Sequence, residues 1–241
     1  TAIVGWGMGV TQHAQGVQTV RAIAALALIT GHIGKPRSGL APVRGQNNVQ
    51  GSCDMGMWPS LYPGYQRVDD PAARAKFAAA WGVPEERLSL KPGWKLTDLP
   101  HAVEEGKVRA FYNFGEDPLQ TEPDTAQMRR TLENLDLLIS QDIFMTQTTA
   151  LADVVLPAAT YEERDGFGGL NAYRISCINK AIEPVGDSKP DNTIFLELGK
   201  RLTAAIKPEN QDIAWPWDDV QEMWDYALED GGFTWDELRE S

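Results

Sequence analysis

The segment from Arg44 to Gly51 holds the most unusual cluster of potential ligand-binding side chains in the sequence. It contains four amides within five residues, at Gln46, Asn47, Asn48 and Gln50. Amides offer both hydrogen-bond donors and acceptors, which suits a heteroaromatic ligand. The Arg44 guanidinium offers a planar fork of donors for a carboxylate or another oxyanion. Composition alone fits a ligand site and a solvated Asn/Gln-rich loop equally well.

Polar or flexible residues also follow three apolar runs that have the length of strands, at 2–6, 108–114 and 135–140. The candidates at these positions are Met8, Gln12, Gly115, Glu116, Asp117, Gln141 and Asp142. In open α/β sheets, ligands bind beyond the carboxyl ends of the strands. Carboxylates there would accept hydrogen bonds from the ribose or the base of a nucleotide. The alternative is ordinary turn chemistry, for which Gly-Glu-Asp-Pro is well suited.

Strands alternate with helices along the chain, which predicts an α/β fold. We expect a parallel sheet with helices on both faces, similar to dinucleotide-binding domains, plus an irregular loop-rich portion. The expected helices cover residues 15–30, 72–81, 124–134 and 190–202, with a short helix near Thr146 and a further strand at 153–157. Loops are expected at 34–66, 84–94 and 161–187.

The same pattern predicts four parts. Residues 1–66 form a strand, a helix and a ligand loop, 67–106 a helical insert, and 107–205 an α/β domain; 206–241 form an acidic helical tail. The tail tryptophans are expected to dock on a neighbouring domain.

The acidic segment 162–165 is expected to be a solvated charge cluster that could still reach the sheet edge. His13, His32 and His101 are expected at the surface or at helix caps, and Cys53 in inert packing.

Composition excludes several classes of protein. The net charge of −12 at pH 7 argues against a nucleic-acid binder, which needs a basic surface. No apolar run reaches the roughly 18 residues of a membrane span. Cys53 and Cys177 stand alone, so neither a zinc site nor an iron–sulfur site is expected within this sequence. We therefore expect no residue of this chain to be a metal ligand.

Several motifs, in this order, resemble the middle of formate dehydrogenase catalytic subunits, which belong to the bis-molybdopterin guanine dinucleotide oxidoreductases. They are GMGVTQH at 7–13, RGQNNVQGSCDMG at 44–56, YPGYQ at 62–66, GEDPLQT at 115–121, QDIFMT at 141–146 and ADVVLP at 152–157. The resemblance is looser at Glu183-Pro184 and Lys189-Pro190-Asp191.

The resemblance implies a role for each matching residue. Arg44 would orient formate beside the metal. The implied cofactor contacts are Met8, Gln12, Gln46, Gly115, Glu116, Asp117, Thr121, Gln141, Asp142, Arg164 and Asp191. Residues 107–205 would then bind the guanine dinucleotide. The implied reaction is oxidation of formate to CO2 or its reverse, at molybdenum or tungsten, with electrons leaving through a 4Fe-4S cluster.

The resemblance also implies that the chain is a central fragment. The metal's cysteine or selenocysteine ligand and the cluster cysteines would precede it, and a last pterin-binding domain would follow, so the fragment alone is expected to be inactive. Its partners would be the remainder of the catalytic subunit and iron–sulfur electron-transfer subunits. A cytoplasmic location is favoured, and a periplasmic one stays open.

The segment GFGGLNAYR at 166–174 departs from the family's usual pattern. Two alternatives therefore stay open. One is the same family acting on nitrate, on a sulfur oxyanion or in a hydration. The other is a non-catalytic scaffold subunit of an electron-transfer complex.

Overall fold

The computed structural model describes residues 1–171, 174–205 and 215–240. The chain divides into two compact units, Thr1–Met55 and Gly56–Ser241. Each unit is described by itself below. The finer division into four parts stays a prediction.

The first unit is built on a parallel strand pair. Strand β1 (Ile3–Trp6) pairs with β2 (Gly39–Pro42), with Ile3 opposite Gly39 and Trp6 opposite Pro42. Helix α1 (Gly16–Ile29) connects them, in agreement with the expected strand and helix. A Cβ atom at Gly16 would lie 2.1 Å from the carbonyl oxygen of Thr11. Only glycine therefore allows the turn after β1 to fold this closely onto the helix start.

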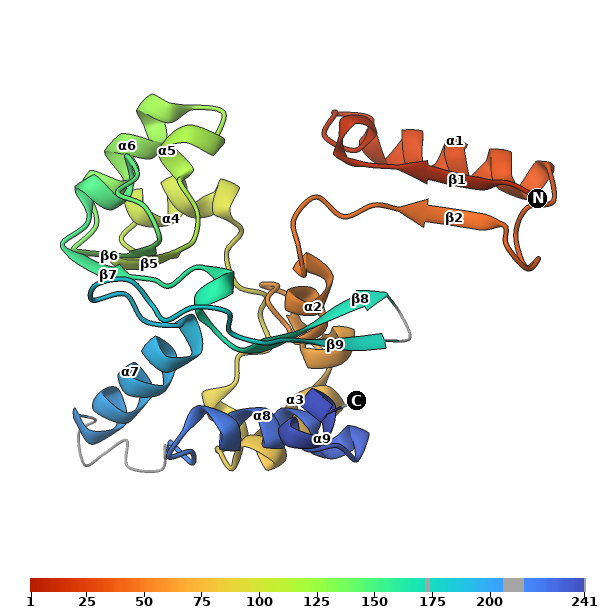
Figure 1. Cartoon of the computed structure of the whole chain (residues 1–241). Coiled ribbons are helices and arrows are strands. Elements are labelled where there is room, and N and C mark those ends of the chain that lie inside the picture. Colours follow the sequence, from red (N-terminus) through yellow and green to blue (C-terminus); the bar gives the residue numbers. More distant parts are fainter. Residues whose placement is uncertain (172–173, 206–214, 241) are drawn as a thin grey trace. The chain divides into compact units, whose positions relative to one another are not determined.

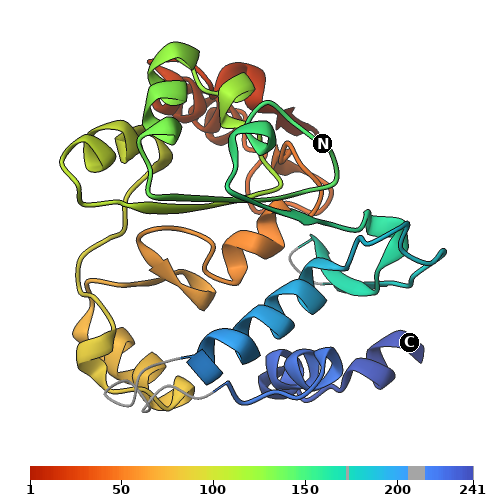
Figure 2. The same cartoon turned by 90° about the vertical axis from the view of Figure 1, so that its left-hand side faces the viewer.

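The second unit contains a sheet in the order β5-β6-β7, with all strands parallel. The strands are β5 (Ala110–Phe114), β6 (Leu137–Asp142) and β7 (Val154–Pro157). One face is covered by α4 (Leu99–Glu104), α5 (Pro118–Thr121) and α6 (Thr125–Glu133), and the other by α7 (Asp191–Ala205) (Figures 1 and 2). The expected α/β class, with helices on both faces of a parallel sheet, is confirmed.

Strand alternation places the core of this sheet. Leu138 is 2% exposed and packs with the buried side chains of one cluster, which are Leu99, Val103, Leu119, Met128 and Leu132. On the other face, the rings of Tyr112 and Phe114 contact Phe195 of α7, with centroid distances of 5.9 and 5.4 Å. Because successive side chains of a strand point to opposite faces, each strand contributes to both layers.

Two expected loops contain regular structure. Residues 34–66 include β2, α2 (Val49–Asp54), β3 (Leu61–Tyr62) and the first residue of β4 (Gln66–Arg67). Residues 161–187 include an antiparallel hairpin of β8 (Gly166–Asn171) and β9 (Arg174–Ile178). The prediction failed because glycine-rich strands have weak β-propensity and are stabilised by pairing rather than by local sequence. Residues 172–173 of the atypical segment lie outside the described residues.

Shorter elements also differ from the expectation. The sequence did not predict α4 or α5, which are six and four residues long and have proline in the first turn. The helix expected near Thr146 is a three-residue 3-10 turn at Thr149–Leu151. Helix α3 (Pro71–Trp81) agrees with its prediction, since Asp70 accepts a hydrogen bond from the amide of Ala72 and Gly82, with φ +64°, ends it.

The acidic tail packs onto the rest of its unit. Helices α8 (Val220–Leu228) and α9 (Trp235–Glu240) bring Trp224 and Trp235 together at a centroid distance of 4.1 Å. Trp235 is 2% exposed and also lies 6.3 Å from Phe167 of β8. The Tyr226 hydroxyl donates to the carbonyl of Ala80 in α3 at 3.2 Å. These contacts lie within the tail's own unit, so docking on a neighbouring domain stays a prediction; residues 206–214 of the tail lie outside the described ranges.

Candidate functional site

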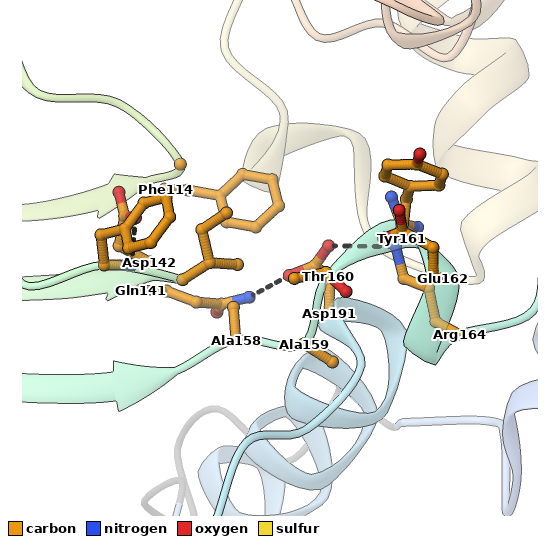
Figure 3. Close-up of a pocket in the computed structure, with 13 residues that line it drawn as sticks. Phe114, Gln141, Asp142, Ala158, Ala159, Thr160, Tyr161, Glu162, Arg164 and Asp191 are labelled. Carbon is orange, nitrogen blue, oxygen red and sulfur yellow. Dashed lines mark hydrogen bonds and ion pairs between the residues drawn. The ribbon is translucent and has the colours of Figure 1, made fainter. Parts of the chain in front are cut away.

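A pocket of about 450 Å³ opens at the carboxyl end of the β5-β6-β7 sheet. Its lining comes from the ends of β5 and β6, the segment after β7 and the first residue of α7 (Figure 3). Five of the residues singled out in the sequence meet there, which are Gly115, Gln141, Asp142, Arg164 and Asp191. Pockets of this size suit a ligand of nucleotide dimensions. The topology thus brings together residues that are far apart in the sequence, from Gly115 to Asp191.

The strand ends shape this pocket by local turns. Gly115 has φ +61°, a conformation that glycine adopts at little cost directly after β5. After β6, the Asp142 carboxylate accepts a hydrogen bond from the amide of Phe144 at 2.8 Å. The rings of Phe144 and Tyr161 are exposed beside these turns, at 73% and 60%. Aromatic rings at the rim of a polar pocket can stack on a planar ligand.

A hydrogen-bonded chain of side chains crosses the pocket. Gln141 is fully buried, and its Nε2 donates to Oδ1 of Asp191 at 2.8 Å (Figure 3). The Tyr112 hydroxyl donates to Oε1 of the same amide. Arg164 Nε lies 3.8 Å from Oδ2 of Asp191. Burial, followed by the negative charge of Asp191, raises the pKa of Tyr112 above its usual value, so its hydroxyl stays protonated.

Three further predicted contacts lie beyond the pocket lining. The Thr121 hydroxyl donates to Oε1 of Glu116 at 2.9 Å. The Asp117 carboxylate accepts from the amide and the hydroxyl of Thr148, at 3.0 and 2.6 Å. Because Thr148 is fully buried, Asp117 ties the turn after β5 to the connection between β6 and β7. The structure therefore assigns Asp117 a framework contact that the sequence did not reveal.

The first unit brings together the other predicted residues. A Cβ atom at Gly45 would lie 3.6 Å from Cγ of Met8, so the turn after β1 contacts the amide-rich segment. Arg44 Nη2 donates to Sγ of the buried Cys53 at 3.6 Å. Gln12 and Gln46 are exposed. The strand-end turn and the arginine segment, far apart in sequence, thus lie side by side in this unit.

The acidic segment after β7 is not solvated as expected. Glu163 is 4% exposed, and its two carboxylate oxygens accept from the amides of Thr160 and Val185, at 2.8 and 3.1 Å. Asp165 accepts from the amide of Lys180 at 2.8 Å. A buried carboxylate that receives two backbone amides fixes the local chain path. The solvated-cluster prediction is wrong, because these carboxylates hold the backbone on both sides of Arg164.

The histidines take no part in the pocket. A ring nitrogen of His13 lies 2.8 Å from the carbonyl oxygen of Gly9, and the side chain of His101 is 78% exposed. Both agree with the surface or cap prediction.

Within the described ranges, no group of three or more His, Cys, Asp or Glu side chains is placed to hold a metal ion. Every helix of the part that the structure describes is too short or too polar to traverse a bilayer.

Glu197 contacts Lys189, whose backbone pairs with a residue that lines the pocket. The backbone of Lys189 forms a β-bridge with the pocket residue Ala158, and its ammonium contacts Oε1 of Glu197 at 2.8 Å. Arg201 donates to the other oxygen of Glu197 at 3.0 Å. The hydrogen bonds from Lys189 and then Arg201 lower the pKa of Glu197 below its usual value.

Glu197→Gln should therefore make stability less sensitive to acid. A lowered folded-state pKa stabilises the fold above the unfolded value of about 4.3, and this contribution is lost as the pH falls through the folded value. We expect the melting temperature of the wild-type protein to fall more steeply between about pH 5 and about pH 3 than that of the variant. Glu86→Gln, in an exposed turn, is the matched control. Parallel curves for wild type and Glu197→Gln would contradict the role.

Three comparisons place this geometry among known proteins. The chain is 47% identical over 225 residues to "Formate dehydrogenase H" of Escherichia coli (strain K12), a match that covers 93% of this chain and 30% of that protein. It is 44% identical over 197 residues to "F420-dependent formate dehydrogenase subunit alpha" of Methanocaldococcus jannaschii, covering 81% of this chain and 28% of that protein. The chain thus spans under a third of these relatives.

A solved structure, "Acetylene Hydratase from Pelobacter acetylenicus", matches with a TM-score of 0.53 at 24% identity, over 70% of this chain and 23% of that one. At this identity the likeness concerns the fold alone. The model of the family described as "Molybdopterin oxidoreductase" matches residues 1–201. Since this match takes in the arginine segment, the strand-end turns and the pocket, the chain belongs to the molybdopterin oxidoreductase family, whose members use a molybdopterin cofactor.

Proposed function

We propose that this chain is the central part of a longer protein that oxidises formate to CO2 or catalyses the reverse reaction. The observation that carries this proposal is the 47% identity to a formate dehydrogenase over 93% of the chain. Oxidation of formate releases CO2, one proton and two electrons. The cofactor supplies the two-electron chemistry when bound. The residues of this chain would bind the cofactor and orient the formate.

In this proposal the pocket would hold the nucleotide end of a bis-molybdopterin guanine dinucleotide carrying molybdenum or tungsten. Arg164 Nε is buried and has no hydrogen-bond partner among the described residues. It could therefore donate to a ligand acceptor such as a phosphate oxygen. The carboxylates of Asp142 and Asp191 lie in the same pocket and would accept from the N–H groups of guanine. Gly115 and Gln141 complete this group of proposed contacts.

The remaining proposed contacts are residues that do not line this pocket. Glu116 and Asp117 lie in the turn after β5, Thr121 is the last residue of α5, and all three would approach the same nucleotide. In the first unit, Met8, Gln12 and Gln46 would contact the cofactor nearer its metal. Arg44 would receive the formate carboxylate, since its guanidinium supplies two parallel donors and a positive charge. The hydrogen bond to Cys53 restricts that guanidinium to fewer orientations.

The proposal includes an electron path and partners outside this chain. A 4Fe-4S cluster, held by other residues of the catalytic subunit, would receive the electrons, and iron–sulfur subunits would pass them on. We propose a cytoplasmic location, with the periplasm as the alternative.

The test is made on the full-length protein purified with its native partners. Formate-dependent reduction of a viologen dye, together with bound molybdenum or tungsten and guanine nucleotide, is the expected result. Bound metal and pterin without formate turnover would redirect the assignment to another substrate, such as nitrate, a sulfur oxyanion or a hydration substrate. Absence of metal and pterin from the native complex would favour a non-catalytic scaffold.

A further inference from the structure

Tyr112 lies behind the pocket and does not line it. It belongs to β5, and its ring packs against Phe195 of α7 at a centroid distance of 5.9 Å. Its hydroxyl nevertheless reaches Oε1 of Gln141 on the neighbouring strand. Gln141 in turn donates to Asp191 at the start of α7. A side chain outside the pocket is thus connected to one of the carboxylates within it.

We propose that Tyr112 is a positioning residue for nucleotide binding, which acts through the Gln141 amide to hold the Asp191 carboxylate in one orientation. This inference rests on the proposed function, because it requires a nucleotide in the pocket. It adds a residue that neither the sequence motifs nor the pocket lining indicates.

The direction of the hydrogen bonds follows from the groups themselves. An ionised carboxylate only accepts, so the Gln141 amide must turn its NH2 toward Asp191 and its oxygen toward Tyr112. Tyr112 can then only donate. Because Gln141 is buried, an amide that lost this donor would leave Oε1 without that hydrogen-bond partner.

The consequence concerns which oxygen of Asp191 meets the ligand. Oδ1 is occupied by Gln141 at 2.8 Å, whereas Oδ2 lies 3.8 Å from Arg164 Nε, beyond the usual hydrogen-bond distance. Asp191 therefore keeps acceptor capacity for a ligand with N–H donors. Guanine presents two such donors on one edge and adenine does not present the same pair. A fixed carboxylate would favour guanine, whereas one free to rotate would discriminate less.

Tyr112→Phe in the full-length holoenzyme tests the proposal. The substitution keeps the ring that packs on Phe195 and removes only the hydroxyl. A neutral hydrogen bond contributes roughly 0.5–1.5 kcal/mol, so we expect guanine nucleotide to dissociate about two- to twelvefold faster under a mild denaturant challenge. At each time point the folded protein is separated and hydrolysed in acid, and the GMP that it yields is measured. The amount of GMP reports how much guanine nucleotide the protein still holds.

Tyr226→Phe is the matched control, because it also removes a tyrosine hydroxyl donor, the one bonded to the carbonyl of Ala80, and Tyr226 does not line the pocket. Its nucleotide dissociation rate should change less than that of Tyr112→Phe. Equal rates for Tyr112→Phe and wild type would overturn the proposal. So would a lower melting temperature with unchanged nucleotide retention, since that pattern describes a purely structural residue.

Gln141→Glu gives a second, pH-dependent readout. The groups that face position 141 are Asp191 and Tyr112, with Arg164 beside Asp191. Two carboxylates in contact cannot both stay ionised easily, so nucleotide retention should be poor at about pH 8 and recover toward about pH 5, as one carboxyl takes up a proton. Retention in this variant that equals wild type at both pH values would contradict the assigned bonding.

The failure of this inference is distinguishable from failure of the proposed function. Nucleotide release is measured without formate, so a protein that retains guanine nucleotide but acts on another substrate still tests Tyr112. A wild-type protein that contains no guanine nucleotide would overturn both.

Discussion

Arg44→Ala in the full-length protein is expected to lower kcat/KM for formate by about 10²–10³-fold, the usual effect of removing one donor that faces developing charge. The reason is that the guanidinium is the group of the first unit best suited to bind a carboxylate in a defined direction. Arg44→Lys keeps the charge but loses the planar fork, so its kcat/KM should lie between those of the wild type and Arg44→Ala. The measurement is formate-dependent dye reduction by enzyme of known metal content.

Arg21→Ala serves as the control for this experiment, because Arg21 lies exposed on α1 of the same unit. It should retain wild-type turnover. Metal and guanine nucleotide contents of all variants should match those of the wild type. Full formate turnover by Arg44→Ala at full metal occupancy would refute the assigned role.

Leu138→Ala is expected to lower the stability of the second unit strongly. Leu138 is 2% exposed at the centre of the cluster between the sheet and helices α4 and α6. Removing its side chain is expected to cost about 2–5 kcal/mol, from lost burial and the cavity that remains. Hydrogen–deuterium exchange of the β6 amides measures this locally, even when a large protein does not unfold in one step.

The neighbouring residue provides a sharp control. Leu137 is 37% exposed in the same strand, so Leu137→Ala should reduce the opening free energy by less than about 1 kcal/mol. Similar protection in the two variants would show that the strand does not distribute its side chains between the two faces as the structure has it.

Local patterns predicted the regular parts of the fold well. The parallel strands β1, β5, β6 and β7 and the helices α1, α3, α6 and α7 begin and end within a few residues of their expected bounds. Each contains an apolar pattern long enough to identify its period. The hairpin β8-β9 and the short helices α4 and α5 lack such a pattern, because their stability comes from partners elsewhere in the chain.

The sequence by itself determined the α/β class and the positions of the strand ends, because periodicity and turn residues act over a few neighbouring residues. Only the tertiary structure decided which strand-end residues share a pocket. Gln141 meets Asp191 across 50 positions, and Asp117 turns to Thr148 across 31. Such pairings depend on how the sheet and α7 pack, which no local pattern specifies. Tyr112 shows this most clearly, since its hydroxyl has a role only once β5 lies beside β6.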